Sequence, residues 1–594
     1  MKLLLCAVNA KYIHSNLAVY SLKAYSEAVE KQNGWDVKIK EYTINHRQED
    51  ILSDLYKEKP DVVVFSCYIW NISMIYSVCQ DLYRVLPKTR IWLGGPEVSY
   101  DSEKVLKNHP EIDLIMEGEG EKTFSRLLET NSFHEVKKSE KQEVVMGQIA
   151  GITYRDEEGK IVRNLPGPLL SMDEIPFVYQ DMELFEHKII YYETSRGCPF
   201  SCSYCLSSID KSVRFRSFSL VEKELAFFLE NRVPQVKFVD RTFNCNREHA
   251  RQIWNYILER DNGVTNFHFE IAADLLEEED LQMMARMRPG LIQLEIGVQS
   301  TYGPTILEIR RKMDLEKLAD RVARVKKQKN IHQHLDLIAG LPYEDLDTFR
   351  QSFLDVYAME PDQLQLGFLK VLKGSYMEER VKDYELLYKK EAPYEVLATK
   401  WMSYDDILLL KGVEEMVEVY YNSGQFRFSL AYLMHFVDNA FVFYEKLAAY
   451  YEKYGLFKVK HNRSSRYEIL IWFAGEEELG EESVLLELLT YDLYLRENMK
   501  SRPEWAKDLS LWKGKYNEFF RQIGQQYLGE EEYDSRKAAR QNHIEYTSFD
   551  IEETAKTGKV CPKECHLLFD YQHRNPLTMD ARVVEINLKL IKNK

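Results

Sequence analysis

No apolar stretch in this sequence approaches the roughly 20 residues that a membrane-spanning helix needs. The chain starts with a short apolar segment, residues 3–8, that runs directly into Asn9. This pattern predicts a buried strand and no signal sequence. Nine cysteines, an odd number, argue against the disulfide framework of a secreted protein. We therefore expect a cytoplasmic protein with no membrane partner.

An excess of basic residues is also absent. The chain has 95 acidic and 79 basic side chains, a net charge of −16 at pH 7. Nucleic acid is therefore not favoured as a partner, although it is not excluded, because proteins that bind it usually carry a basic footprint. The basic stretches at residues 310–312, 321–329 and 458–466 are interpreted as solvated faces. The length predicts about three or four domains.

The most informative motif is a group of three cysteines in one short stretch. Cys198, Cys202 and Cys205 have the spacing CxxxCxxC, with Tyr204 before the last of them. Thiolates are the usual ligands of iron–sulfur clusters, and a [4Fe–4S] cluster held by three of them keeps one iron open to a small molecule. A zinc site would need further cysteines or histidines at short spacing, and none lies near Cys205. The motif predicts a cluster that performs chemistry at its open iron.

The cysteine motif resembles that of the radical S-adenosylmethionine (SAM) enzymes. The resemblance implies that the amino and carboxylate groups of SAM chelate the open iron. One electron from the cluster then splits SAM into methionine and a 5′-deoxyadenosyl radical. The resemblance also implies an electron donor of the flavodoxin or ferredoxin type. Tyr204 is expected to cover the cluster or lie near the adenine, and a role as a packed aromatic is an equal alternative.

From residue 189 to residue 370, strand-like and helical segments alternate. About six βα units predict a partial TIM-type barrel, with its active site at the carboxyl ends of the strands. The Gly-Gly-Glu-like turn that the resembled family carries after the second strand is replaced by residues 240–244. No catalytic residue is predicted, and Glu295 is as readily structural as functional. The resemblance implies SAM contacts from Thr242, Asn244, Glu270, Gln299 and Gly340.

The first 135 residues alternate short apolar runs with helices, which predicts a Rossmann-like, doubly wound parallel sheet. Upstream of a radical motif, this pattern resembles the cobalamin-binding domain of cobalamin-dependent radical SAM enzymes. The usual Asp-x-His-x-x-Gly motif is absent. We therefore expect cobalamin to bind without His14 as its lower axial ligand, and His14 to start a helix or contact the corrin edge. The implied cobalamin contacts follow the third, fourth and fifth strands: Tyr68, Trp70, Asn71, Gly94, Gly95, Pro96, Glu97, Glu117, Gly118 and Glu119.

The remaining segments carry weaker signals. Residues 136–185 are expected to be a linker, residues 186–375 the barrel, and residues 376–594 a mainly α-helical domain that resembles an uncharacterised extension. Cys561 and Cys565 form a CxxxCH pair that could bind an auxiliary metal, form a redox couple or have no role. Methylthiotransferases carry three cysteines for a second cluster in a preceding α/β domain. Here only Cys67 lies where a ligand should, because Cys6 falls in a strand and Cys79 in a helix.

The combined resemblance covers roughly residues 1–375. It implies a cobalamin-dependent radical SAM enzyme, most readily a methyltransferase that acts at an unactivated carbon. Methylcobalamin would supply the methyl group, and a second SAM would remethylate the cobalt. The alternatives are a radical oxidation, cyclisation or rearrangement without methyl transfer, or a methylthiotransferase-like or non-catalytic cofactor-binding protein. The sequence leaves the substrate open among peptide, lipid, natural product and tRNA nucleoside.

Overall fold

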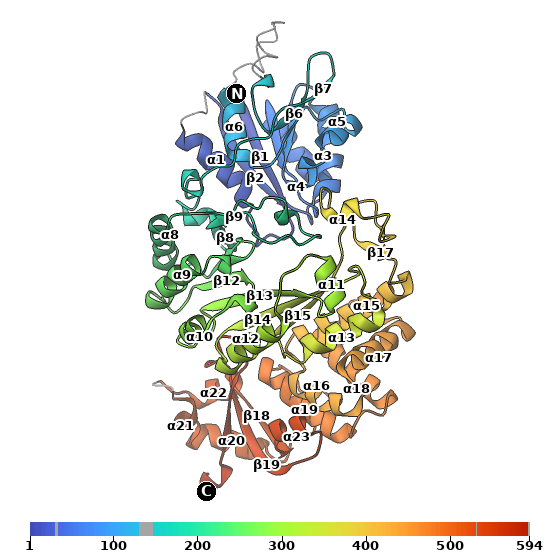
Figure 1. The fold of residues 1–594 in the computed structure, drawn as a ribbon. Helices are drawn as coiled ribbons and strands as arrows, with labels where there is room; N and C mark the ends of the chain where they lie inside the picture. Colours follow the sequence, from blue (N-terminus) through green and yellow to red (C-terminus); the bar gives the residue numbers. More distant parts are fainter. Residues whose placement is uncertain (30–33, 130–145, 530–531, 592–594) are drawn as a thin grey trace.

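The structure is a computed structural model of the full chain, and it describes residues 1–29, 34–129, 146–529 and 532–591. Three parts follow one another from the N-terminus at the top of Figure 1 to the C-terminus at the bottom. They are an α/β part, a central parallel sheet with helices, and a largely helical part. Within the described residues, no helix is both long and apolar enough to cross a membrane.

The N-terminal part is a seven-stranded sheet in the order β2-β1-β3-β4-β5-β6-β7. The first five strands in that order are parallel, and β6 and β7 join in antiparallel fashion. The order changes direction between β1 and β3, which is where α/β sheets of this kind bind ligands. The strands are β1 (Lys2–Asn9), β2 (Asp36–Thr43), β3 (Val62–Ser66), β4 (Arg90–Gly94), β5 (Leu114–Met116), β6 (Ile152–Arg155) and β7 (Ile161–Arg163).

Alternate residues of these strands enter two separate hydrophobic cores, because successive side chains of a strand point to opposite faces. Leu4 of β1 packs in the core under α2 (Gln48–Glu58) and α3 (Ile72–Val85). Leu3 and Leu5 pack in the core under α1 (Leu17–Ala28) and α6 (Gly120–Glu129). Burial on both faces explains the nearly continuous apolar run of β1. The predicted doubly wound sheet is confirmed.

The central part is a six-stranded parallel sheet in the order β8-β11-β12-β13-β14-β15. The predicted partial barrel of six strands is confirmed. The strands are β8 (Ile190–Tyr192), β11 (Gln235–Phe238), β12 (Asn266–Ile271), β13 (Ile292–Gln299), β14 (His332–Ala339) and β15 (Gln363–Phe368). The crossover helices are α8 (Phe218–Glu230), α9 (Arg247–Glu259), α10 (Glu278–Met284), α11 (Gly303–Glu308), α12 (Leu315–Gln328) and α13 (Leu346–Tyr357).

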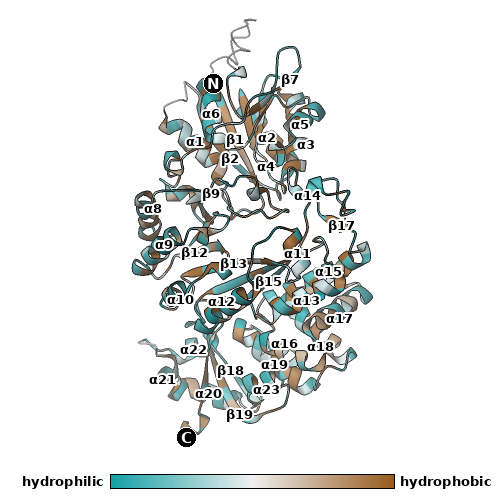
Figure 2. Ribbon diagram, in the orientation of Figure 1, coloured by the Kyte–Doolittle hydropathy of each residue, from teal (hydrophilic) through white to brown (hydrophobic). Residues whose placement is uncertain are grey.

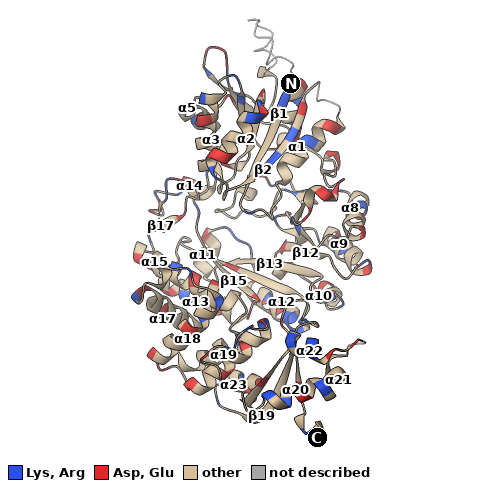
Figure 3. Ribbon diagram, turned by 180° about the vertical axis from the view of Figure 1, so that it is seen from behind, with Lys and Arg blue, Asp and Glu red and all other residues tan. Residues whose placement is uncertain are grey.

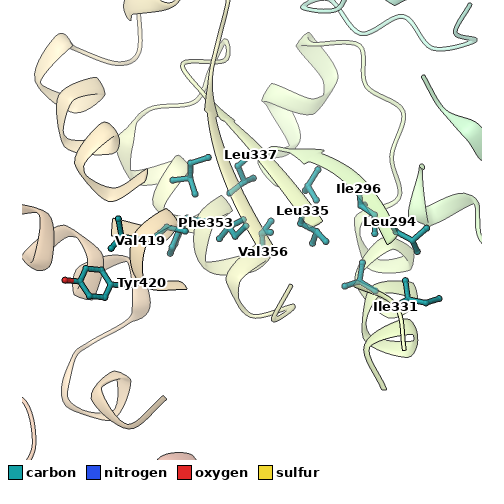
Figure 4. Packing of buried hydrophobic residues seen from close by; sticks show 14 of the residues in the cluster. Leu294, Ile296, Ile331, Leu335, Leu337, Phe353, Val356, Val419 and Tyr420 are labelled. Atoms are coloured by element: carbon teal, nitrogen blue, oxygen red, sulfur yellow. The ribbon is translucent and has the colours of Figure 1, made fainter. Parts of the chain in front are cut away.

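The outer face of this sheet is apolar and packs against its helices. Figure 4 shows Leu335 of β14 near Val356 of α13, and the same core includes Leu294 of β13, Phe353 and Tyr420. Tyr420 belongs to a π-helical turn, Val417–Asn422, of the C-terminal part. One hydrophobic core therefore joins the barrel to the C-terminal part.

The C-terminal part is mainly helical, as predicted, and it also contains an antiparallel sheet that we did not predict. This sheet has the order β18 (His543–Phe549), β19 (Pro562–Asp570) and β20 (Arg582–Ile586). The helices are α14 (Tyr376–Glu379), α15 (Tyr404–Met416), α16 (Arg427–Leu433), α17 (Ala440–Lys453), α18 (Arg463–Glu476), α19 (Glu482–Arg496), α20 (Lys513–Gln522), α21 (Gly524–Leu528), α22 (Ser535–Gln541) and α23 (Ile551–Thr557).

The predicted linker of residues 136–185 contributes β6 and β7 to the N-terminal sheet, and its residues 136–145 lie outside the described residues. The domain boundaries themselves stay predictions. Figure 2 places the hydrophobic residues mainly on the strands and the inner helix faces. In Figure 3, acidic and basic residues intermix over the visible helices, as on a solvated surface. The basic stretch on α12 fits that interpretation, since Arg324 pairs with Glu278 at 2.6 Å.

Gly95 joins the loops that follow β3 and β4. Its φ of +112° lies in the region that favours glycine, and an added Cβ would meet the Cys67 carbonyl oxygen at 2.5 Å. The Cys67 amide also donates a hydrogen bond to the Gly94 carbonyl at 2.7 Å. The two loops can approach this closely only because residue 95 has no side chain.

Gly95→Ala should therefore lower the free energy of unfolding of the N-terminal sheet by about 3 kcal/mol or more, from backbone strain plus the clash. Hydrogen exchange of the β3 and β4 amides measures this change. Gly118→Ala is the matched control, because Gly118 has φ +70° with no atom within 4 Å of an added Cβ. It should cost about 1 kcal/mol. Equal losses in the two variants would contradict the close approach.

Candidate active site

The cysteine loop leaves the carboxyl end of β8. Cys198 and Cys202 are buried, Cys205 is half-buried, and all three are free thiols. Gly197 permits the turn into the loop, since its φ is +96° and an added Cβ would lie 2.8 Å from the Ser212 carbonyl oxygen. Three thiols on one short loop are a donor set that fits three irons of a [4Fe–4S] cluster.

Asp240, at the carboxyl end of β11, fixes the start of this loop. Its carboxylate accepts hydrogen bonds from the Thr194 hydroxyl at 2.7 Å, the Ser195 hydroxyl at 2.5 Å and the Thr194 amide at 3.1 Å. The side chain is almost completely buried, and burial raises its pKa to about 6. Asp240 therefore acts on the cysteines through Thr194 and Ser195, a few residues before Cys198.

Arg311 is the main residue of this site that sequence reasoning missed. Its guanidinium donates to the Tyr204 hydroxyl at 3.3 Å, lies 3.9 Å from Cys202 Sγ and donates to the Gly297 carbonyl. Burial raises the pKa of the Cys202 thiol, and the charge of Arg311 opposes that rise. The interpretation of residues 310–312 as a solvated face was wrong for Arg311. It suits Arg310 better, whose guanidinium lies 3.7 Å from the centre of the Tyr376 ring.

Two of the predicted SAM contacts make interactions that are structural. The Asn244 side-chain amide donates a hydrogen bond to the Ala272 carbonyl at 2.8 Å and accepts one from the Ala272 backbone amide at 2.9 Å. Gly340 has φ +85°, and an added Cβ would lie 2.8 Å from Val396 Cγ1, so the position needs glycine. Their roles toward SAM stay predictions.

Three other predicted contacts have groups available for a ligand. The Thr242 hydroxyl lies 3.8 Å from Cys198 Sγ. Gln299 is 9% exposed, adopts φ +76°, and its buried Oε1 has no hydrogen-bond partner in the described part of the chain. Burial raises the pKa of Glu270 to about 7. An orphaned amide oxygen is a group that a bound polar molecule would satisfy.

The carboxyl edge of the N-terminal sheet faces the carboxyl edge of the barrel. Burial raises the pKa of Tyr68, after β3, and the charges that act on this phenol include Arg241 and Glu193, which follow β11 and β8. Tyr68 stacks on Trp70 with ring centres 4.4 Å apart, and Trp70 remains 45% exposed. Asn71 fixes this loop by donating to the Val8 and Ser66 carbonyls, each at 3.0 Å. Stacked aromatic rings beside the loop of Gly95 suit a large planar cofactor.

The acidic residues predicted to contact cobalamin are engaged in ion pairs. Glu117 pairs with Arg163 at 2.7 Å. Glu119 pairs with Arg214 at 2.5 Å and lies 3.4 Å from Arg196, which also binds Glu121 at 2.9 Å. We call the group Arg196, Arg214, Glu119 and Glu121 the Arg196 clamp. It joins the loop after β5 to the strands that flank the cysteine loop, β9 (Ser195–Arg196) and β10 (Arg214–Phe215).

A second group, which we call the Lys373 clamp, lies after β4. Lys373 pairs with Glu97 at 3.2 Å and with Asp101 at 3.3 Å, and the Tyr394 hydroxyl donates to Glu97. Pro96 begins the short helix α4 (Pro96–Ser99) beside it. Both clamps tie the N-terminal part to the rest of the chain. The predicted cobalamin contacts of Glu97, Glu117, Glu119, Gly118 and Pro96 stay predictions.

His14 lies at the contact with the barrel. Its Nδ1 is 2.5 Å from the Tyr191 hydroxyl, and the backbone amide of Ile189 donates to the Ile13 carbonyl at 2.7 Å. Helix α1 begins later, with Asn16 as its cap. His14 is therefore no helix-start residue, and its side chain is engaged with β8.

Among the described residues, Cys6, Cys67 and Cys79 do not bring three ligand atoms together at one point. Cys6, Cys67 and Cys79 share one hydrophobic core at 0% exposure, and burial raises the pKa of each thiol. Thiolate ligation is thereby disfavoured. Cys565 lies on β19 beside the Thr547 hydroxyl, and Cys561 lies four residues earlier, roughly 13 Å away along an extended chain. A disulfide needs a closer approach.

Three family models match the chain: "B12 binding domain" over residues 4–128, "Radical SAM superfamily" over residues 192–356, and "Protein of unknown function (DUF4080)" over residues 382–569. The chain is similar to an uncharacterised methyltransferase of Pyrococcus horikoshii, with 26% identity over 50% of this chain and 63% of that protein. It is also similar to the 2-(S-pantetheinyl)-carbapenam-3-carboxylate methyltransferase of Streptantibioticus cattleyicolor, with 27% identity over 66% of this chain and 61% of that protein. The chain thus spans less than two thirds of the length of these relatives.

Two solved structures have the same fold. The cobalamin-dependent SAM radical enzyme OxsB, with aqua-cobalamin and SAM bound, has a TM-score of 0.56 at 17% identity. The match covers 83% of this chain and 78% of that one. The methyltransferase TsrM from Kitasatospora setae, with cobalamin and a [4Fe–4S] cluster, has a TM-score of 0.52 at 16% identity, over 66% and 76% of the two chains. The predicted B12-binding and radical SAM domains are confirmed by the family models, which support the predicted cofactors.

Arg311→Met should slow alkylation of Cys202 in the cluster-free protein several-fold at neutral pH, because the thiolate loses its neighbouring positive charge. Peptide mass spectrometry after timed exposure to iodoacetamide measures the rate at this one residue. Arg310→Met is the matched control, since the Arg310 side chain lies on Tyr376. An equal effect in both variants would contradict the specific contact.

Asp240 should also make stability depend on pH. Its pKa is raised from 3.8 to about 6 on folding, so the native state binds more protons between these values. The free energy of unfolding should therefore fall as the pH rises from about 4 to 6, by at most about 3 kcal/mol. Urea unfolding at both pH values should show this fall in the wild type and not in Asp240→Asn. A fall of the same size in the variant would assign it to other groups.

Proposed function

We propose that this chain, a radical SAM protein with an N-terminal B12-binding domain, is a cobalamin-dependent methyltransferase that acts at an unactivated carbon. The observation that supports the proposal most is that the carboxyl edge of the N-terminal sheet faces the carboxyl edge of the barrel. Glu121 of the B12-binding domain binds Arg196, two residues before Cys198, at 2.9 Å. Glu97 of the same domain binds Lys373, which follows the last barrel strand, at 3.2 Å. Such an arrangement gives one substrate access to both cofactors. The methyltransferase names of several relatives support methyl transfer.

Each cofactor has residues suited to hold it. Cys198, Cys202 and Cys205 would bind the [4Fe–4S] cluster. Thr242 and Gln299 offer polar atoms to SAM beside them. The Tyr68–Trp70 stack and the loop of Gly94 and Gly95 would receive cobalamin, with Asn71 holding that loop in place. When bound, these groups supply the one-electron cleavage of SAM and a transferable methyl group.

The protein's own side chains would set the environment of that chemistry. Arg311 places a buried positive charge beside Cys202 and Tyr204, which favours thiolate ligands and a negatively charged cluster. Asp240 holds the start of the cysteine loop through Thr194. Glu270 is largely buried, and a pKa of about 7 allows it to hold or release a proton near neutral pH. This makes Glu270 a candidate to bind a polar group of the substrate.

A reaction without methyl transfer is the second candidate. The chain also resembles an anaerobic magnesium-protoporphyrin IX monomethyl ester cyclase of Rubrivivax gelatinosus, with 24% identity over 57% of this chain. The 4′-phospho-dehydrooxetanocin synthase of Priestia megaterium is a further relative, at 24% identity. Those names support cyclisation or rearrangement as alternatives.

A flavodoxin- or ferredoxin-type donor and a cytoplasmic location complete the proposal. A radical SAM domain needs a reductant, which supports a donor without identifying it. The nine free thiols support a reducing compartment. The substrate is left open.

Cofactor content separates the two domains. After anaerobic reconstitution we expect about four irons and one corrinoid per chain. Cys198, Cys202 and Cys205 changed together to alanine should remove the iron and keep the corrinoid. Trp70→Ala should weaken corrinoid binding about tenfold, through lost stacking, and keep the iron. Metal analysis and the visible spectrum measure both. The matched control is Trp472→Ala, since Trp472 is 58% exposed on α18.

Turnover with SAM that carries a deuterated methyl group then tests the reaction among candidate substrates. A product that carries the label, together with 5′-deoxyadenosine, supports methyl transfer. 5′-Deoxyadenosine with an unlabelled product would favour the second candidate. Four irons without any corrinoid would overturn the proposal as a whole.

A further inference from the structure

The barrel interior contains ionisable side chains where such barrels usually hold branched apolar ones. Four adjacent strands contribute them: Lys237 from β11, His268 from β12, Glu295 from β13, and His334 and Asp336 from β14. Glu295 lies directly opposite His334 in the register, and Lys237 lies opposite His268. These positions alternate with Leu294, Ile296, Leu335 and Leu337, which Figure 4 shows on the helix-packed side.

Lys237 donates a hydrogen bond to Glu295 at 3.0 Å, but the imidazole nitrogens and the Asp336 carboxylate lie close together without well-formed hydrogen bonds. His334 Nε2 lies 3.0 Å from Asp336 Oδ1, and His268 Nε2 lies 3.1 Å from Glu295 Oε2. Yet both imidazole nitrogens and Asp336 Oδ1 lack a hydrogen-bond partner of acceptable geometry within the described ranges. His268 and His334 are each 7% exposed, so water does not readily satisfy them. Buried polar atoms that lie close together without hydrogen bonds need another partner, and an ion placed between them would be such a partner.

The spacing of these atoms suits a metal ion. Ligand atoms of Glu295, His334 and Asp336 all lie within 4.8 Å of one another. Ligands at about 2.1 Å from a common ion are themselves separated by roughly 3 to 3.5 Å, close to the two contacts above. One imidazole with two carboxylates favours zinc, iron, manganese or cobalt over magnesium and calcium, because nitrogen donors suit transition metals.

The two carboxylates supply the negative charge that a divalent ion needs, and Lys237 adds one positive charge beside them. Two carboxylates compensate a charge of two, and a neutral imidazole adds a donor without charge. Lys237 lies 3.0 Å from Glu295 Oε2 and leaves the second oxygen of that carboxylate available. Its ammonium group keeps Glu295 from being a lone buried charge before metal binding, and it disfavours ions of higher charge.

We propose that Glu295, His334 and Asp336 form a binding site for one divalent transition-metal ion inside the barrel. Three protein ligands leave coordination positions open. Glu295 lies two residues before Gly297, whose carbonyl accepts a hydrogen bond from Arg311 beside Cys202. An oxygen or nitrogen atom of the substrate could therefore bind the ion below the SAM site. That last role rests on the proposed function, whereas metal binding does not.

Cobalt titration tests the site in the full-length chain with Cys198, Cys202 and Cys205 changed to alanine, which removes the cluster and its thiols. We expect one Co²⁺ per chain, with visible ligand-field bands and no thiolate charge-transfer band. His334→Ala should weaken binding by about 100-fold, and Asp336→Asn and Glu295→Gln by about tenfold or more. The readout involves neither SAM nor cobalamin, so it is independent of methyl transfer.

His332→Ala is the matched control, because His332 lies on the same strand two residues earlier and its Nδ1 also lacks a partner in the described structure. It should leave Co²⁺ affinity unchanged. Circular dichroism verifies that each variant is folded. If His334→Ala is not folded, the Co²⁺ affinity of the near-isosteric Asp336→Asn variant tests the proposal instead. The proposal is overturned by absence of stoichiometric Co²⁺ binding, or by binding that survives Asp336→Asn and Glu295→Gln unchanged.

Discussion

The arrangement of the site depends on one half-buried guanidinium. Arg196 stands two residues before Cys198 and binds Glu193 at 2.7 Å and Glu121 at 2.9 Å. Although burial opposes its charge, these carboxylates raise the pKa of Arg196. Removing one partner from such a partly buried network leaves uncompensated charge, which costs several kcal/mol. The cysteine loop is therefore attached to the B12-binding domain by an interaction that is difficult to break.

The Lys373 clamp supplements this attachment from another side of the interface. Glu97 and Asp101 belong to the B12-binding domain, whereas Lys373 follows the last barrel strand. Two separate attachments restrict how the carboxyl edges can rotate relative to each other. Bringing two cofactors to one substrate requires such a fixed distance, because small displacements of reacting groups reduce rates strongly. The acidic loops that looked like cofactor contacts in the sequence thus have a positioning role in the fold.

The barrel combines two kinds of face on the same strands. Its outer face joins the helices and the C-terminal domain in one hydrophobic core, which includes Leu335 and Tyr420. Its inner face holds paired charges, such as Lys237 with Glu295. The sequence identified Glu295 only as an ambiguous residue, because the alternation of β13 predicts which face it occupies and not what it meets there. The cross-strand partners come from residues dozens of positions away, and the register alone selects them.

The sequence by itself determined the features that depend on short spacing and local period. The CxxxCxxC loop, the alternation of strands and helices, and the tandem of a B12-binding and a radical SAM domain could all be recognised, because each is written within a few residues or turns. Tertiary structure alone decided that Arg311 contacts Cys202, 109 residues away in the sequence. It also decided that Glu97 and Glu119 form ion pairs with basic side chains of another domain. It also added the β18–β20 sheet. Long-range pairs follow from how elements pack, and packing energy is shared among too many side chains for spacing along the chain to encode it.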